Sequence, residues 1–323
     1  MTTQDKRTAA LDLVSECTDA LRDLSDAERV RTAVASLAAR AYQLQGSVDD
    51  RPYFTRTMSR IAHVVRSHGW VEVAGETLEW TIAQGAVDGY VLSEVAECHL
   101  ARGAVDAAEA TLARARAANV ATDAIYTSLV KAYGRSGRPD DARRMFERAR
   151  TDEALTAFTY PALIAAYGAA GDLPAARRAF EGARLDGRLS PPAFTALATA
   201  CANVGDLAGV EAVLSMARAA GHASSRLTLT AIRAYLESRQ FAAARRVLED
   251  AKGHGLADGP CYAVLIASCH KAGRHREAKR VVTSAASDER LTPDERKRIK
   301  YAHARTRRDG AATGGRVAVM AAA

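Results

Sequence analysis

Apolar residues recur three or four positions apart through the middle of the chain, which is the spacing of one face of an α-helix. Between Asp123 and Thr156 the first such stripe consists of Tyr126, Leu129, Val130 and Tyr133. After a short polar segment a second stripe follows, made of Ala142, Met145, Phe146 and Ala149. The pattern predicts two helices joined by a tight turn.

The same pattern returns every 34 residues. Tyr126 recurs as Tyr160, and Ala142 recurs as Ala176. Six of the seven positions in step with the turn hold glycine, and the seventh holds Arg239; the glycines are Gly69, Gly103, Gly137, Gly171, Gly205 and Gly273. Self-similarity at a fixed period is the mark of a solenoid. We therefore expect an all-α, right-handed α-solenoid of about seven helix-turn-helix repeats.

The spacing divides the chain into a cap, an array and a tail. Residues 1–54 are out of register, and two helices within 5–45 predict an N-terminal helical cap. The repeats are 55–88, 89–122, 123–156, 157–190, 191–224, 225–258 and 259–292. A capping helix over 293–309 starts at Thr292-Pro293-Asp294-Glu295, and 310–323 is expected to be a disordered tail.

Local chemistry supports the hairpin. Gly137 tolerates the left-handed backbone that ends a helix, and Pro139 suits the first turn of the next one. Ala142 is expected to be small because the two helices approach closely there. Since one hairpin cannot bury its apolar face alone, neighbouring hairpins must stack.

The amino-acid composition favours a helical fold and leaves two kinds of role for the basic charge. Apolar residues make up 48% of the chain but aromatics only 6%, which suits tightly packed helix pairs. The net charge is +7: residues 1–50 carry −3, and 51–290 and 291–323 carry +5 each. A modest basic excess fits either solubility or a polyanionic partner.

Cysteine usage and targeting signals bear on the compartment. The five cysteines have no paired spacing and predict buried thiols in a reducing compartment; they are Cys17, Cys98, Cys201, Cys261 and Cys269. There is no signal peptide and no apolar run of membrane-spanning length. We expect a soluble, cytoplasmic protein, with mitochondrion or chloroplast as the alternative in a eukaryote.

The repeats resemble pentatricopeptide repeats. Their first helices read IYTSLVKAY (125–133) and TYPALIAAY (159–167), an aromatic residue followed by Leu-Ile or Leu-Val, and their ends read like VLEDAKGHGLADG (247–259). The proline typical of tetratricopeptide ends is absent there. The period of 34 and the alanine at Ala149 and its equivalents are instead similar to tetratricopeptide repeats, which remain the second choice.

The pentatricopeptide resemblance implies binding of single-stranded RNA on the concave face, one base per repeat. It assigns the first-helix readers to Ser59, Ser93, Thr127, Pro161, Thr195, Leu229 and Ala263. It assigns the junction partners to Asp88, Thr122, Thr156, Ser190, Ser224, Asp258 and Thr292, with Asp123 and Gly259 as alternatives beside Thr122 and Asp258. Ser59 with Asp88 resembles the combination that favours a purine, whereas Pro161, Leu229 and Ala263 have no hydrogen-bonding side chain.

Basic residues provide two candidate phosphate surfaces. Lys131, Arg135, Arg233 and Lys271 lie on the predicted first helices and are the expected backbone contacts. Second helices carry Arg143-Arg144, Arg177-Arg178, Arg245-Arg246 and Lys279-Arg280. We interpret these pairs as a solvated outer face with helical partners such as Glu147, and the alternative is a phosphate-tracking stripe.

No motif of catalysis is present. The sequence contains no P-loop, no HExxH and no third ligand at metal spacing beside His270 and His275. We expect no enzyme activity, no cofactor, no small-molecule substrate and no membrane contact. The predicted function is RNA binding that stabilises or helps to process transcripts. The alternative is a scaffold that holds a protein or peptide in its groove.

Overall fold

The computed structural model describes residues 3–24, 26–43, 51–120, 122–301 and 303–304. Every regular element within these ranges is a helix, and none is a strand. The chain divides into two compact units, residues 1–159 and 160–323. The all-α solenoid expected from the period is confirmed, and the predicted tail over 310–323 lies outside the described residues.

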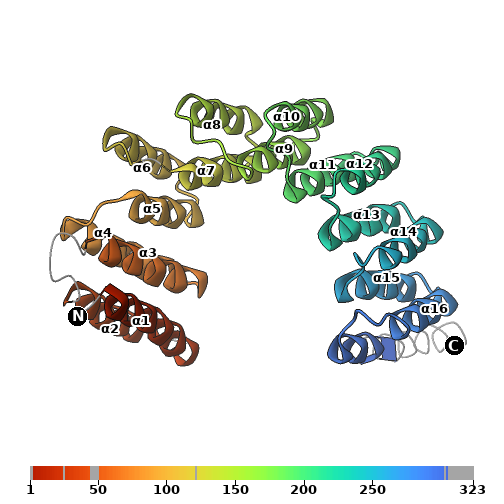
Figure 1. The fold of residues 1–323 in the computed structure, drawn as a ribbon, viewed down its shortest axis with the longest axis horizontal. Helices are drawn as coiled ribbons and strands as arrows, with labels where there is room; N and C mark the ends of the chain where they lie inside the picture. The colour runs from red at the N-terminus through yellow and green to blue at the C-terminus, as the bar shows by residue number, and fades with distance from the viewer. Residues whose placement is uncertain (1–2, 25, 44–50, 121, 302, 305–323) are drawn as a thin grey trace, which may run out of the picture. The chain divides into compact units, whose positions relative to one another are not determined.

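The repeats are helical hairpins that pair a first helix with a second helix (Figure 1), and in the fourth repeat Ile164 of the first helix shares a core with Phe180 of the second. The first helices are α3 (Arg51–Ser67), α5 (Gly89–Ala101), α7 (Asp123–Arg135), α9 (Thr159–Ala169), α11 (Pro191–Asn203), α13 (Ser225–Glu237) and α15 (Gly259–Lys271). The second helices are α4 (Val71–Ala83), α6 (Val105–Ala117), α8 (Pro139–Thr151), α10 (Leu173–Leu185), α12 (Leu207–Ala219), α14 (Phe241–Gly253) and α16 (His275–Ala286). Each second helix therefore begins 34 residues after the previous one.

Two first helices depart from the expected start. α3 begins at Arg51, four residues before the expected boundary between cap and repeats at residue 55. α9 begins at Thr159, two residues later than the period places it. The Thr156 hydroxyl accepts a hydrogen bond from the Phe158 backbone N–H at 3.3 Å, and the Thr159 hydroxyl accepts one from the Thr156 N–H at 3.2 Å. These side-chain bonds form a local turn that competes with the first helical turn.

The turn of each hairpin adopts the left-handed backbone expected for Gly137, whose φ is 68°. In the sixth repeat Arg239 takes the same conformation with a φ of 56°. Asn119 and Glu153 do so at the ends of α6 and α8, with φ of 55° and 54°. The stacking of hairpins thus imposes this geometry even where the sequence offers no glycine, at a cost to a residue with a Cβ.

The core follows the small residues of the second helices. Ala142 and its equivalents, including Val210 in the fifth repeat, are fully buried. In residues 1–159, α3 contacts α5 and α5 contacts α7; in residues 160–323, α11 contacts α13 and α13 contacts α15. The five cysteines are buried, and burial raises the pKa of Cys17, Cys98 and Cys269 to about 11 and that of Cys261 to about 12.

Two helices precede the repeats, as expected. They are α1 (Thr3–Asp23) and α2 (Ala27–Gln43), and their apolar residues share one core with α3, α4 and α5. After the repeats a helix covers 293–301. It begins with a capping box in which the Thr292 N–H donates to Glu295 at 2.9 Å and the Glu295 N–H donates to Thr292 Oγ1 at 3.2 Å. No described helix is both long and apolar enough to cross a membrane.

Candidate nucleic-acid interface

Four of the predicted junction residues cap the helix that follows them: Thr292, through the capping box described above, and Asp88, Ser224 and Asp258. Asp88 accepts a hydrogen bond from the Val91 N–H at 2.9 Å, and Asp258 accepts one from the Cys261 N–H at 3.1 Å. The Ser224 hydroxyl accepts one from the Leu227 N–H at 3.3 Å. A side-chain oxygen at this position satisfies a backbone donor that the first turn leaves open. The resemblance to pentatricopeptide repeats did not reveal this capping role.

In the second repeat the predicted reader and its junction partner meet. The Ser93 hydroxyl lies 2.7 Å from the Thr122 hydroxyl, and Ser93 also donates to the Gly89 carbonyl at 2.6 Å. Thr122 packs on Gly89, where a Cβ would clash with the Thr122 methyl group. Of the two alternatives for this junction, Thr122 touches the reader, whereas Asp123 is exposed.

In the third repeat, a third hydroxyl lies between the predicted reader and its junction partner. Thr127 lies 3.1 Å from the hydroxyl of Thr159, and Thr159 lies 3.3 Å from the hydroxyl of Thr156. Thr159 was not among the predicted residues. Its involvement follows from the late start of α9, which places its first residue beside the reader of the preceding repeat.

The other predicted readers are less well equipped. Ser59 is buried, and its hydroxyl has no hydrogen-bond partner in the described structure. The Thr195 hydroxyl donates to the Pro191 carbonyl at 3.1 Å within its own helix. Pro161 is buried, and Leu229 and Ala263 are half-buried. Hydroxyl clusters that join a reader to its junction therefore occur in the second and third repeats, both within residues 1–159.

Two exposed aromatic rings lie beside these hydroxyls in the sequence. Tyr90 precedes Ser93 on α5 and is 56% exposed, and Phe158 precedes α9 and is 61% exposed. The Arg56 guanidinium lies over the Tyr90 ring at 5.5 Å. Both rings occupy the second residue of their repeats, two repeats apart. Sequence reasoning missed them, although aromatic residues at the same position of two repeats are a signal that the period reveals.

The basic residues expected on the first helices are exposed. Lys131, Arg135, Arg233 and Lys271 form no ion pair in the part of the chain that the structure describes. The first helices also carry acidic residues that are already paired. Glu94 bonds Arg66 at 3.2 Å, and Glu97 accepts a hydrogen bond from Ser128.

Some of the arginines on the second helices form ion pairs with carboxylates of this chain. Arg144 bonds Glu109 at 2.9 Å, and Arg177 bonds Asp206 at 2.7 Å. The expected helical partner Glu147 instead bonds Arg150 at 3.2 Å, three residues further on. These arginines therefore pair with carboxylates of the neighbouring repeat rather than with the expected i,i+4 partners.

Three histidines lie close together in and just after the last repeat. His270 Nδ1 lies 3.2 Å from His275 Nδ1, and His270 Nε2 lies 2.8 Å from His303 Nδ1. Burial and the two neighbouring imidazoles lower the pKa of His270. The contacts use opposite sides of the His270 ring, and no group of three ligands suited to one metal ion occurs among the described residues.

Comparisons with known proteins agree with the repeat geometry. The pentatricopeptide (PPR) repeat family matches residues 124–153. No curated protein sequence matches the chain.

Similar solved structures include two of one plant protein and one from yeast. The crystal structure of pentatricopeptide repeat protein PPR10 from maize matches at 20% identity and a TM-score of 0.49, covering 99% of this chain and 44% of that one. PPR10 in complex with an 18-nt psaJ RNA element matches at 21% identity and a TM-score of 0.51, covering 80% and 38%. Yeast Tom70 matches at 11% identity and a TM-score of 0.55, covering 94% and 64%. The chain spans less than half the length of PPR10.

Proposed function

We propose that this chain, which is a pentatricopeptide repeat protein, binds single-stranded RNA along its first helices and acts by occupancy, without catalysis. Bound RNA would be stabilised or presented for processing by other factors. The observation that carries the proposal is the 2.7 Å contact between Ser93 and Thr122, a reader and its junction partner, next to the exposed ring of Tyr90.

The physical basis is a surface that offers rings, hydroxyls and charge together. A base can stack on an exposed aromatic ring such as Tyr90 or Phe158, which contributes about 1–3 kcal/mol per base. Hydroxyls of Ser93 and Thr122 can donate to or accept from the edge of that base. Lys131 and Arg135 can then meet phosphates. The fold shared with RNA-bound PPR10 supports the proposal by analogy.

Sequence discrimination is proposed to be weak. Ser93 and Thr122 already satisfy one another, so a base must exchange one good hydrogen bond for another. Asp88, Ser224 and Asp258 hold helix starts with the same oxygens that would read a base. We therefore expect affinity to depend more on stacking and charge than on base identity.

A second candidate function is a scaffold for a protein or peptide. It is favoured by the reader positions of residues 160–323, where Pro161, Leu229 and Ala263 offer no polar side-chain atom. Apolar groove positions suit a peptide side chain better than the edge of a base.

Titration of labelled random single-stranded RNA against wild-type protein and the Tyr90→Ala/Phe158→Ala variant separates the two candidates. We expect binding at low salt that weakens by about tenfold or more when both rings are removed. A double-stranded RNA of equal length is the control and should bind less tightly, because its bases are not free to stack. No binding of single-stranded RNA at low salt would leave only the scaffold.

A further inference from the structure

Two joints between neighbouring repeats contain the same three residues. At the first joint, Tyr133 of α7 donates to Glu109 of α6, and Arg144 of α8 bonds Glu109 at 2.9 Å. Arg144 also bonds Asp141 at 2.6 Å, so two carboxylates hold its guanidinium. Three repeats further along, the equivalent residues are Tyr235 of α13, Glu211 of α12 and Arg246 of α14.

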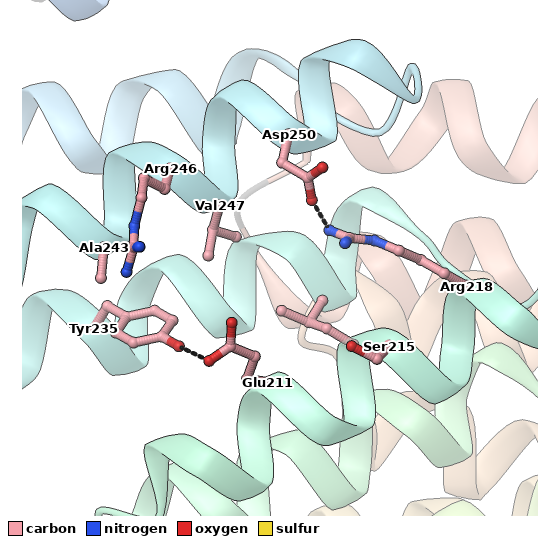
Figure 2. Close-up of a pocket in the computed structure, with 9 residues that line it drawn as sticks. Glu211, Ser215, Arg218, Tyr235, Ala243, Arg246, Val247 and Asp250 are labelled. Carbon is pink, nitrogen blue, oxygen red and sulfur yellow. Dashed lines mark hydrogen bonds and ion pairs between the residues drawn. The ribbon is translucent and has the colours of Figure 1, made fainter.

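The second joint lacks one carboxylate. Ala243 occupies the position equivalent to Asp141. The Tyr235 hydroxyl lies 3.4 Å from Glu211, and Arg246 is exposed with no ion pair or hydrogen bond within the described residues. Figure 2 shows the Arg246 side chain beside Ala243 and above Tyr235. A guanidinium that two carboxylates hold at one joint is therefore unpartnered at the other.

An open groove accompanies this difference. It has a volume of about 230 Å³ and lies between α12 and α14, with Tyr235 of α13 in its lining; Leu214, Ser215, Val247 and Ala243 contribute the rest of its less polar wall. At its other end the Arg218 guanidinium is paired with Asp250 (Figure 2). The Arg218 Nε atom, however, is buried without a hydrogen-bond partner in the described structure. Because this atom is buried and Arg218 is already paired with Asp250, Arg246 is the arginine that an occupant of the groove can reach.

We propose that this groove, which we call the α12/α14 groove, binds an acidic segment of a partner protein. One carboxylate of that segment takes the place that Asp141 fills at the first joint and pairs with Arg246. The proposal is independent of RNA binding, because α12 and α14 are second helices and the proposed RNA surface lies on first helices.

The groove favours a carboxylate over a nucleic-acid phosphate. Glu211 and Asp250 both line it, so the two arginines are balanced by two acids. A phosphate backbone would bring several negative charges past these acids, whereas a peptide brings isolated carboxylates with neutral backbone between them. Planar carboxylates also match the bidentate fork of an arginine.

The test uses the full chain and a fluorescein-labelled, glutamate-rich peptide, with the glutamine version of the peptide as a control. Ala243→Asp supplies the missing carboxylate from α14 itself and should weaken glutamate-peptide binding by about fivefold or more. Ala242→Asp makes the same change of charge at the exposed neighbouring position, outside the groove lining, and should leave binding near the wild-type value.

Two further measurements make the result decisive. Nuclear magnetic resonance of arginine Nε–H groups should show a peptide-dependent shift for Arg246 in the wild-type chain and not in Ala243→Asp. Asp141→Ala serves as a control at the first joint, because Arg144 stays bonded to Glu109 there and the change should leave peptide binding in the α12/α14 groove unaltered. Equal weakening by Ala242→Asp and Ala243→Asp, shifts spread over arginines outside the groove, or an RNA oligonucleotide that shifts Arg246 as the peptide does would overturn the proposal.

Discussion

The Tyr262 hydroxyl donates a hydrogen bond of 2.8 Å to the buried carboxylate of Asp288, which lies two residues beyond the end of α16. The same pair ties the first helix of a repeat to the end of its second helix twice more, as Tyr126 with Asp152 and Tyr160 with Asp186. Where the fourth residue of the repeat is Phe194 or Thr228, the aspartate is replaced by Ala220 or His254. The two positions therefore change together along the chain.

Loss of the phenol should destabilise the last repeat. Tyr262→Phe removes the donor to Asp288 Oδ2 and leaves the buried carboxylate with the Arg290 backbone N–H on Oδ1, so we expect the free energy of unfolding in urea to fall by about 1–3 kcal/mol. Tyr235→Phe is the matched control, because its bond to Glu211 is long at 3.4 Å and its loss should cost less. Equal losses in the two variants would contradict the role assigned to the Tyr262–Asp288 pair.

The aspartate pair also predicts a dependence on pH. Hydrogen bonds from Arg116 and Tyr126 hold the pKa of Asp152 below its ordinary value of 3.8. A carboxyl group with a lowered pKa in the folded state stabilises the protein above that ordinary value, and this contribution is lost as the pH falls through the lower folded-state pKa. Thermal unfolding should therefore show Asp152→Asn to be destabilising at pH 7, with the difference from wild type shrinking below about pH 4. A difference that stays constant down to strong acid would contradict this assignment.

Arg239 is predicted to be replaceable with a gain in stability. Its φ of 56° places a Cβ in the left-handed region that glycine occupies at the equivalent turns. Arg239→Gly should raise the free energy of unfolding by about 0.5–1 kcal/mol. Arg239→Ala is the control for loss of the side chain and should give no such gain. The reverse change at an equivalent turn, Gly137→Ala, should lower stability.

The cysteine thiols should be slow to react in the folded protein. All five are buried, and burial raises the pKa of Cys261 to about 12, so little thiolate is present near neutral pH. A thiol-reactive dye should label the chain slowly under native conditions and fully in denaturant. Rapid labelling of any of the five in the folded state would show that the packing around that residue is loose.

Gly89 should be required for the Ser93–Thr122 contact. A Cβ there would lie 2.7 Å from the Val120 carbonyl oxygen and would clash with the Thr122 side chain. Gly89→Ala should therefore displace the junction and weaken RNA binding more than it weakens overall stability. Gly253→Ala is the control, because a Cβ at that helical glycine meets no atom within 4 Å. Unchanged RNA affinity in Gly89→Ala would remove the Ser93–Thr122 pair from the interface.

The hairpins were predictable from the sequence because their signals recur. Gly137, Pro139 and Ala142 each have equivalents one period away, so a weak local preference becomes a strong one when repeated. Even Arg239 keeps the geometry of the turn, since the stacked neighbours on either side determine the backbone there. The Thr292–Glu295 capping box could be predicted for a different reason, because this cap is a contact between residues three apart in the sequence.

The candidate sites were only partly predictable, because they depend on contacts between repeats. That Thr159 meets Thr127 follows from the two-residue delay of α9, which depends on the turn formed by the Thr156 and Thr159 side chains and breaks the period of the repeats. Asp88 caps a helix as well as standing at a junction, because α5 starts at the next residue. The unpaired guanidinium of Arg246 becomes visible only when Ala243 is compared with Asp141 in an equivalent joint.

The salt dependence of RNA affinity tests the central claim most directly. The logarithm of the association constant for single-stranded RNA, plotted against the logarithm of salt concentration, should have a slope of about −0.7 for each phosphate that the protein engages. Neutralising Lys131, Arg135, Arg233 and Lys271 should make this slope shallower by about 0.7 for each side chain that meets a phosphate. Neutralising four exposed second-helix residues, Arg143, Arg178, Lys279 and Arg280, should change it little. A slope that is unaffected by the first set and reduced by the second would contradict RNA binding on the first helices.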